Sequence, residues 1–433
     1  MKIKFAHVSD CHLGAWRKET LNQIGYSAFE TMIDKVIVEK VDFVIIAGDL
    51  YDVSNPKVDV VDFTTRHLKR LSDNDIPVYG IMGSHDFSPS DKSMIRPLIS
   101  AGLFKNVSIP EWVDEAKHPL RLQFEIDPKT KIKITGMRAK KRSLELEDYE
   151  MLDTPYLDHE EGVKIFILHT LLSEMKPIEY KDMASGPKSM LPQDFWYYAG
   201  GHLHKTVPEE LREGPITIKK DSKFQKRIVY PGSLYPTNSR ELETFQYGGF
   251  CLISGDIPQG DLTVEYVPLK IKEVSRIYID ANNKSISKVK ERIEQEIIRG
   301  KFEDKIVVVR MEGEISSGKS HEIPGNEIVQ QIREKGAYEV LINKANLTSA
   351  QYEKISIDSS KTNEQIESEL IYKHAQQIEL HGLSKKEVEH RIHQLLGALG
   401  KEREEGGKVK DYDAQIIESF YNILDITMEE GNK

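Results

Sequence analysis

The sequence predicts an α/β protein whose sheets are covered by helices on both faces. Short runs rich in β-branched residues recur from residue 1 to about residue 270, and most end in polar residues. Stretches with helical periodicity separate them, as at residues 58–71. Strands that are apolar along their whole length suit a sheet buried on both faces, and intervening helices suit crossover connections. These observations favour an α/β sandwich or a doubly wound sheet.

Length and composition indicate a soluble protein with more than one domain. The 433 residues are 39% hydrophobic and 30% charged, enough for a substantial core. No apolar stretch reaches the roughly 20 residues of a membrane helix, and the charged start lacks the apolar region of a signal peptide. We therefore expect a cytoplasmic protein that does not bind membranes.

Two further counts restrict the chemistry. Cys11 and Cys251 are too few for a disulfide framework or a four-thiolate zinc site, so any metal must rely on His and carboxylates. The net charge of −10 argues against a protein that coats DNA through clustered cations. It does not exclude nucleic acid, because acidic residues around divalent ions can form an anion-binding site.

Residues 1–270 are expected to form the first domain and to carry the functional site. Its predicted strands include IKFAHVSD, VDFVIIAGD, IPVYGIMGSHD, KIKITGMR, VKIFILHT, WYYAGGHLH and RIVYPGS. Ligands of such folds gather at the carboxyl ends of strands. The polar residues that follow the runs should therefore converge.

Residues 271–345 are expected to form a second, smaller α/β domain. Its order is the strand VSRIYIDAN, the helix KSISKVKERIEQEIIRG, the strand KIVVVRMEGEI, a helix near 327–335 and the strand AYEVLINKA. This segment is the least acidic of the three.

Residues 346–433 are expected to form a linker, SIDSSKTNEQ, and a helical tail. Helices are predicted at 364–381, 384–399 and 411–428. The last places Tyr412, Ile416, Ile417, Phe420 and Leu424 on one face. Such a helix either folds back on its own domain or docks in a partner's groove, and periodicity alone leaves both open.

Asp and His recur where five predicted strands end. They are Asp10, His12, Asp49, Asp52, His85, His169, His202 and His204, with Ser84 beside His85. Singly, such an Asp is often a helix cap and such a His a structural residue. Together, they suit Mn²⁺, Fe²⁺ or Zn²⁺, and one carboxylate, here Asp49, can bridge two ions roughly 3.5–4 Å apart. Paired ions would activate water against a phosphate.

The ordered set D-x-H, GDxxD, G-x-HD, H and GHxH resembles the calcineurin-like metallophosphoesterases. More narrowly, HVSDCHLG, FVIIAGDLYD, YYAGGHLHK and YPGSLYPTNSRE resemble the nuclease subunit of the SbcCD-type (Mre/Rad) complex of DNA double-strand-break repair. The resemblance implies a β-sandwich flanked by helices, a small α/β capping domain that recognises DNA and a helical, partner-binding C-terminal tail.

The resemblance also implies a role for each site residue. One ion would be held by Asp10, His12, Asp49 and His204, and the other by Asp49, His169 and His202 with help from Ser84. His85 would act beside the scissile phosphate, and Asp52 would orient it. The family has Asn at position 84, and the shorter hydroxyl of Ser84 is a poorer ligand. Natural variation with retained activity, weakened catalysis and an inactive scaffold all remain open; we favour the first because the other ligands are present.

The implied function is that of a Mn²⁺-dependent DNA nuclease, with 3′–5′ exonuclease activity at DNA ends and endonuclease activity on single strands. The implied partners are double- and single-stranded DNA ends, an SMC-like coiled-coil ATPase of the SbcC type on the C-terminal helices, and a second copy in a homodimer. On DNA the protein would be associated with the nucleoid. Two alternatives stay open: a metallophosphoesterase for small phosphodiesters or phosphoproteins, and a DNA-end-binding scaffold weakened by Ser84.

Several basic residues are candidates for contacts to DNA phosphates. They are Arg17, Lys18, Arg138, Lys140, Lys141 and Arg142, together with the run at 219–227. Solvated loops are an equally good explanation of such runs. Two residues near the ligands receive structural assignments: His7 is expected to be a buried hydrogen-bonding residue, and Cys11 to point away from its neighbours Asp10 and His12.

Overall fold

The computed structural model describes residues 1–88, 93–113, 119–219, 222–258, 260–349, 383–400 and 409–424, and a few residues between 365 and 375. It contains two compact units. The first comprises residues 1–279, 292–311 and 324–345, and the second residues 280–291, 312–323 and 346–433. In the described part of the chain, every helix is too short or too polar to span a membrane.

Two sheets form the body of the first unit. The seven-stranded sheet has the order β11-β14-β13-β1-β2-β3-β4, and the five-stranded sheet the order β12-β10-β9-β8-β7. In the first sheet β1 (Lys2–Val8), β2 (Phe43–Ala47) and β3 (Val78–Ile81) run parallel. In the second, β8 (Lys133–Met137), β9 (Lys164–His169) and β10 (Tyr197–Gly201) run parallel.

The remaining strands of this body complete these two sheets, except that β5 and β6 pair with each other in a two-stranded sheet. They are β4 (Lys105–Asn106), β5 (Pro110–Trp112), β6 (Leu120–Leu122), β7 (Glu125–Ile126), β11 (Ile216–Ile218), β12 (Ile228–Val229), β13 (Gly248–Asp256) and β14 (Leu262–Leu269). Among them, β13 pairs antiparallel with β1 and with β14, which extends the seven-stranded sheet beyond its parallel centre.

Apolar side chains from facing strands of the two sheets form a common core. Phe5 of β1 stacks on Phe43 of β2 with ring centroids 4.9 Å apart, and Tyr197 of β10 meets Phe5 edge to face at 5.5 Å. Ile165 and Ile167 of β9 belong to the same cluster. The parallel centres of the sheets are therefore packed face to face.

Helices cover the outer faces of this sandwich. The apolar faces of α1 (Glu19–Val38) and α2 (Val58–Asp73) share a core with the seven-stranded sheet. The helices α4 (Glu145–Met151) and α5 (Thr154–His159) share another with the five-stranded sheet. Two further helices are α3 (Ile95–Ser100) and α6 (Ser239–Phe245). The predicted α/β sandwich flanked by helices is confirmed.

The strand and helix order predicted for residues 271–345 is also confirmed. The elements are β15 (Val274–Asp280), α7 (Ile286–Arg299), β16 (Ile306–Ile315), α8 (Gly325–Glu334) and β17 (Glu339–Ser349), and the strands form a sheet in the order β15-β16-β17. The compact units divide these elements between them, so the domain boundaries at 270 and 345 stay predictions.

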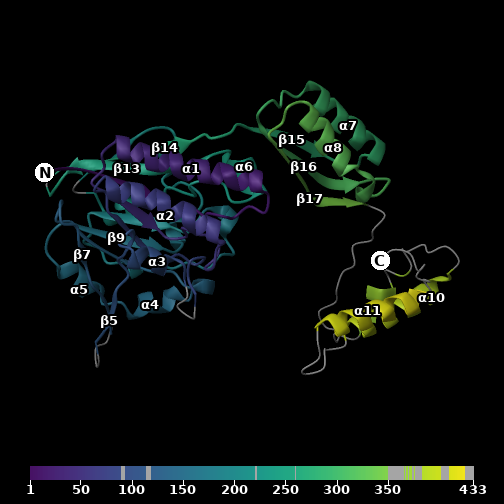
Figure 1. The fold of residues 1–433 in the computed structure, drawn as a ribbon, viewed down its shortest axis with the longest axis horizontal. Helices are drawn as coiled ribbons and strands as arrows, with labels where there is room; N and C mark the ends of the chain where they lie inside the picture. Colours follow the sequence, from purple (N-terminus) through teal and green to yellow (C-terminus); the bar gives the residue numbers. More distant parts are fainter. Residues whose placement is uncertain are drawn as a thin grey trace. The chain divides into compact units, whose positions relative to one another are not determined.

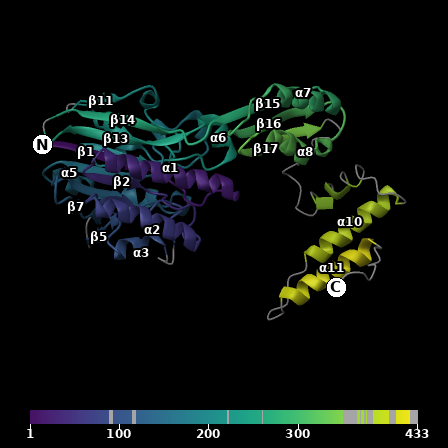
Figure 2. The same ribbon diagram turned by 45° about the horizontal axis from the view of Figure 1, so that its top comes forward.

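In the tail, α10 (Lys385–Leu399) and α11 (Val409–Leu424) lie side by side (Figures 1 and 2). Ser384 caps α10 by accepting a hydrogen bond from the backbone N–H of Glu387. Both helices were predicted, although residues 425–428 of the second, most of the predicted helix 364–381 and nearly all of the linker lie outside the described residues. Apolar side chains remain exposed on the pair, including Leu396, Leu399, Ile417 and Phe420.

Candidate metal centre

The predicted ligands gather at the carboxyl ends of parallel strands in both sheets. Asp10 and His12 follow β1, Asp49 follows β2, His85 follows β3, His169 ends β9, and His202 and His204 follow β10. Face-to-face packing of the sheets brings these ends together. Among the described residues three groups result, Asp10–His12–His204, Asp49–His169–His202 and His12–Asp52–His85, and the ligand atoms within each group lie within 4.8 Å of one another.

The loops that carry the ligands have unusual backbone conformations. Asp10, His12, Asp49 and His202 have φ values of 50°, 42°, 50° and 82°, in the left-handed region that non-glycine residues rarely adopt. Strain of this kind persists only where the surroundings enforce it, and it clusters at functional sites.

Close packing of the loops explains the glycines beside the ligands. A Cβ on Gly48, whose φ is +86°, would lie 2.3 Å from Nδ1 of His169. A Cβ on Gly83 would lie 2.2 Å from Oδ1 of Asp49. Any larger residue at these two positions would push the ligands apart.

The two carboxylates lie between the imidazoles. Oδ2 of Asp49 is 3.1 Å from Nε2 of His169 and 3.6 Å from Nε2 of His12. Oδ1 of Asp10 is 3.8 Å from Nε2 of His204 and 3.9 Å from Nε2 of His169. Nε2 of His12 and Nε2 of His204 are 3.1 Å apart. Asp49 thus lies close to imidazoles of the first two groups, and its role as a bridge between two cations stays a prediction.

The opposite nitrogens of three imidazoles meet acceptors. Nδ1 of His12 is 3.1 Å from Oδ1 of Asp52, Nδ1 of His204 is 2.9 Å from Oε1 of Glu241, and Nδ1 of His169 is 2.8 Å from the carbonyl of Ala47. A carbonyl or an ionised carboxylate cannot donate, so each Nδ1 carries a proton and Nε2 is the nitrogen that can bind a cation. The Nε2 atoms face the centre.

These residues fit a pair of divalent cations. Nε2 of His169 is buried and in hydrogen-bonding geometry with none of the described residues, although two carboxylates approach it. Burial alone lowers the pKa of His169, but the surrounding acceptors and charges, with the charge of Asp49 the largest of them, together outweigh burial and raise this pKa to about 10. Burial also opposes ionisation of Asp49, yet the surrounding imidazoles, with His169 first among them, together hold the pKa of Asp49 below its usual range. The centre therefore favours positive charge, which a metal supplies in place of a proton.

His85 and Asp52 lie beside the first group. The backbone N–H of His85 donates to Oδ1 of Asp49 at 2.7 Å. Nδ1 of His85 is 2.6 Å from the backbone carbonyl of Asp52 but 3.8 Å from its carboxylate, which lies closer to His12. Asp52 is therefore placed to orient His85 through its backbone carbonyl rather than through its carboxylate. Ser84 is half-buried in the same turn, and its role as a ligand stays a prediction.

Asp86 is an important residue that the sequence interpretation missed. Its buried carboxylate accepts hydrogen bonds from the backbone N–H groups of Leu50 and Gly83 at 3.1 Å and of Tyr51 at 2.9 Å. It thereby joins the loop after β2 to the turn after β3. Burial, and then the charge of Asp49, raises the pKa of Asp86 to about 7. Its place in the GSHD motif was the available signal.

Glu241 was also missed. It lies in the first turn of α6, where its backbone N–H donates to the capping side chain of Asn238 at 3.0 Å. Burial opposes ionisation of Glu241, but the hydrogen bond from His204, the charge of His204 and the hydrogen bonds from Thr237 together outweigh burial and lower the pKa of Glu241 to about 2. The segment YPTNSRE that contains it carried the signal.

A cavity of about 230 Å³ opens beside the centre. It is lined by Asp49, His85, Leu171, Tyr180, Met183, His202, Leu203, His204 and Glu241. Candidate ligands thus line one part of the cavity, and Leu171, Met183 and Leu203 give it an apolar wall.

The predicted DNA-binding cations are placed differently from one another. Nζ of Lys18 lies 3.0 Å from Oε1 of Glu339, and Nζ of Lys140 lies 2.7 Å from Oδ2 of Asp148. The guanidinium of Arg138 lies 5.6 Å from the ring centroid of Phe87. Arg17, Lys141 and Arg142 are exposed. These six are not among the described residues that line the cavity, and their contacts with DNA stay predictions.

His7 is a buried hydrogen-bonding residue, as the sequence predicts. Nδ1 of the buried His7 lies 2.9 Å from the hydroxyl of Tyr197. Cys11 is buried, and burial followed by the charge of Asp10 raises the pKa of its thiol well above the usual value. It belongs to none of the candidate ligand groups found among the described residues.

The class of protein follows from comparison with known families. Residues 3–206 match the calcineurin-like phosphoesterase family. Since these residues also carry the parallel centres of both sheets and all three candidate ligand groups, they form a calcineurin-like metallophosphoesterase domain, and the chain is a metal-dependent phosphoesterase. The resemblance predicted from the motifs is confirmed.

Three relatives are each named "DNA double-strand break repair protein Mre11". The protein of Methanococcus maripaludis is 25% identical over 299 residues, which cover 68% of this chain and 73% of that protein. The protein of Sulfolobus acidocaldarius is 27% identical over 322 residues, covering 72% and 76%. The protein of Sulfurisphaera tokodaii is 27% identical over 344 residues, covering 77% and 78%.

Proposed function

We propose that the chain is a two-metal DNA nuclease that acts in double-strand-break repair. The observation that carries this proposal is the position of Asp49 between His12 and His169, with the Nε2 atoms of both rings facing its carboxylate. The similarity to relatives named for double-strand-break repair supports DNA as the phosphodiester substrate.

Each side chain has a role in this proposal. One cation would be held by Asp10, His12, Asp49 and His204, and the other by Asp49, His169 and His202 with help from Ser84. Bound cations of this kind activate water and neutralise charge on a phosphate. His85 is held at Nδ1 by the carbonyl of Asp52, and its side chain is 47% exposed beside the cavity. It can donate a proton to the leaving oxygen.

The finer activities belong to the same proposal. We infer that Mn²⁺ is the metal, that DNA ends are degraded in the 3′–5′ direction and that single strands are cut internally. The segment 271–345 would act as a capping domain that positions duplex ends. Localisation in the cytoplasm, on the nucleoid when DNA is bound, is part of this inference.

Two protein partners are proposed. The exposed apolar residues of α10 and α11, including Leu399 and Ile417, support docking of this helix pair on an SMC-like coiled-coil ATPase of the SbcC type. A second copy of the chain would form a homodimer through helices of the first domain.

One observation favours a second candidate, a phosphoesterase for small phosphodiesters. The cavity of about 230 Å³ has an apolar wall that suits one small substituent as well as it suits part of a polymer. Wild-type turnover of a small phosphodiester with no cleavage of DNA would select this candidate.

The decisive measurement compares wild type with His85→Ala on linear duplex and single-stranded DNA, alone and with the ATPase. With Mn²⁺, wild type should cleave and the variant should not, because the proton donor is lost while the ligands remain. Bound metal, counted by elemental analysis, should be nearly equal in the two proteins. A wild-type protein that binds Mn²⁺ and leaves all these DNA substrates intact would refute the proposal.

A further inference from the structure

The carboxylate of Glu339, the first residue of β17, is buried in a cluster of four donors. Its side chain is only 3% exposed. It accepts hydrogen bonds from Nζ of Lys18 at 3.0 Å, Oγ1 of Thr20 at 2.6 Å, a guanidinium N–H of Arg333 at 3.0 Å and the backbone N–H of Val340 at 2.8 Å. All of these residues belong to the first compact unit. The cluster joins the start of α1 to α8 and β17.

The partners of Glu339 on α1 follow directly on a ligand loop. Lys18 is six residues after His12. Between them, Trp16 is fixed at three points: its backbone N–H donates to the side chain of Asn22, its carbonyl accepts from the same side chain, and its indole N–H donates to the carbonyl of Pro236 at 3.0 Å. A displacement of β17 would therefore act on Lys18 and Trp16, which follow the candidate ligand His12 closely in the sequence.

A second contact reaches the other side of the centre. The side chain of Arg310 in β16 donates to Oε2 of Glu243 at 3.2 Å, and Arg276 in β15 donates to the backbone carbonyl of Glu243 at 3.1 Å. Glu243 lies on α6, two residues after Glu241, which holds His204. Ionic contacts from the three-stranded sheet thus reach two segments that position ligands.

Apolar packing supports these ionic contacts. Ile306 and Val308 of β16 belong to the same core cluster as Leu21 and Ile24 of α1. This packing has little directional preference. The buried carboxylate, by contrast, needs its donors at fixed distances, since an unpaired buried charge is costly. Glu339 therefore selects one placement of the sheet among those that apolar packing alone would allow.

We propose that Glu339 is a positioning residue that holds the three-stranded sheet against the ligand-bearing segments and so makes the centre selective for polymeric DNA over small phosphodiesters. This inference rests on the proposed nuclease function. A long substrate would use surface on the sheet and ligands in the centre at once, whereas a small phosphodiester uses the centre alone. We call Glu339 and its four donors the clamp. Loss of the clamp should therefore affect the cleavage of long substrates and not that of small phosphodiesters.

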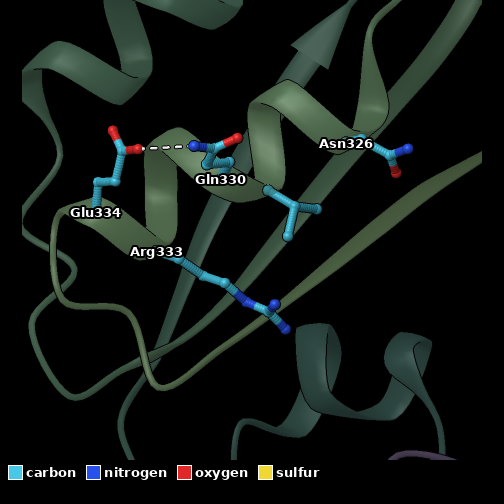
Figure 3. Close-up of a pocket in the computed structure, with 5 residues that line it drawn as sticks. Asn326, Gln330, Arg333 and Glu334 are labelled. Atoms are coloured by element: carbon cyan, nitrogen blue, oxygen red, sulfur yellow. Dashed lines mark hydrogen bonds between the residues drawn. The ribbon is translucent and has the colours of Figure 1, made fainter.

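The test compares Glu339→Gln with a matched control in the full chain. The control is Glu334→Gln in α8. Glu334 lines a shallow depression of about 580 Å³ together with Asn326, Val329, Gln330 and Arg333. Figure 3 shows Glu334 bonded to Gln330, while Arg333 points away from this pair. Both substitutions remove one negative charge from an otherwise similar region, but only one opens the clamp.

Two substrates separate the roles: linear duplex DNA and bis(p-nitrophenyl) phosphate, each with Mn²⁺. For Glu339→Gln we expect kcat/KM on DNA to fall about tenfold, mostly through KM, as fits the loss of one hydrogen bond to a charged group. Turnover of the small phosphodiester and Mn²⁺ stoichiometry should match wild type. Glu334→Gln should change neither substrate. Should Glu339→Gln fail to fold, Thr20→Val removes a single donor with little change of shape and should give a smaller loss in the same direction.

Parallel losses on both substrates, or no loss on DNA, would overturn the inference. Amide hydrogen exchange distinguishes a failure of this inference from a failure of the proposed nuclease function. If wild type cleaves only the small phosphodiester, the nuclease proposal fails and selectivity for DNA fails with it. Faster exchange in β17 and the first turn of α1 of Glu339→Gln would still support the clamp itself, and unchanged exchange would refute it.

Discussion

Nδ1 of His204 lies 2.9 Å from Oε1 of Glu241, a residue 37 positions later in the chain. The contact fixes the imidazole so that Nε2 faces His12 and Asp10. The same arrangement holds His12 against Asp52 and His169 against the carbonyl of Ala47. Each imidazole is thus oriented before any cation arrives, which reduces the cost of binding one.

Glu241→Gln should weaken the first cation site. The amide oxygen can still accept the hydrogen bond from Nδ1 of His204 but carries no negative charge, so the ring loses part of its basicity and Nε2 becomes a weaker ligand. By analogy with other partners of metal-bound histidines, we expect Mn²⁺ affinity to fall about 10- to 100-fold. Isothermal titration calorimetry measures this, with the exposed Glu210→Gln as control. Equal affinities in the two variants would contradict the role given to Glu241.

Asp86→Asn should loosen the join between two ligand loops. The amide keeps one acceptor oxygen. Its NH₂ group replaces the second oxygen, so a backbone N–H that donated a hydrogen bond to this oxygen faces another donor. We expect the free energy of unfolding to fall by about 1–3 kcal/mol, the cost of a lost partner for a buried polar group. Urea unfolding measures it, and activity should fall as the His85 turn shifts. Unchanged stability together with unchanged activity would refute the assignment.

Glu339 should make stability depend on pH in the acid range. Burial opposes its ionisation, but hydrogen bonds from Thr20, the Val340 N–H, Lys18 and Arg333 outweigh burial and lower its pKa to about 2, below the ordinary value of 4.5. A depressed folded-state pKa stabilises the fold above the unfolded-state pKa and loses that effect as pH falls toward the folded-state pKa. The stability difference between wild type and Glu339→Gln should therefore be constant near neutral pH and shrink below about pH 4.5. Urea unfolding at a series of pH values measures it, and a difference independent of pH would contradict the prediction.

Ser84→Asn tests whether position 84 limits the second cation site. An amide oxygen reaches further than a hydroxyl and is the better ligand. We expect tighter Mn²⁺ binding in a titration, a modest gain in cleavage and unchanged DNA binding, because the other ligands are already in place. A wild type without cleavage that becomes fully active on this substitution would instead identify the natural chain as a DNA-binding scaffold.

The sequence by itself determined the strands, the flanking helices and the residues that gather at the strand ends. Apolar β-branched runs can be buried only as strands of a covered sheet, and Asp10, Asp49, His169 and His204 lie at or just after the ends of such runs. Local pattern was sufficient, because the carboxyl ends of parallel strands meet at one edge. The helical tail was predicted for the same kind of reason.

Only the tertiary structure decided which side chains orient the ligands. Asp86 meets Leu50 across 36 positions, and Lys18 meets Glu339 across 321. Local periodicity does not predict such pairs, because the sequence alone does not show whether a given carboxylate is solvated or buried in the fold. Packing of the sheets and helices brings Lys18, for which the sequence predicts a contact with DNA, into an ion pair with Glu339. It also places the carboxylate of Asp52 beside His12. Those choices depend on distances and burial that exist only once the chain has folded.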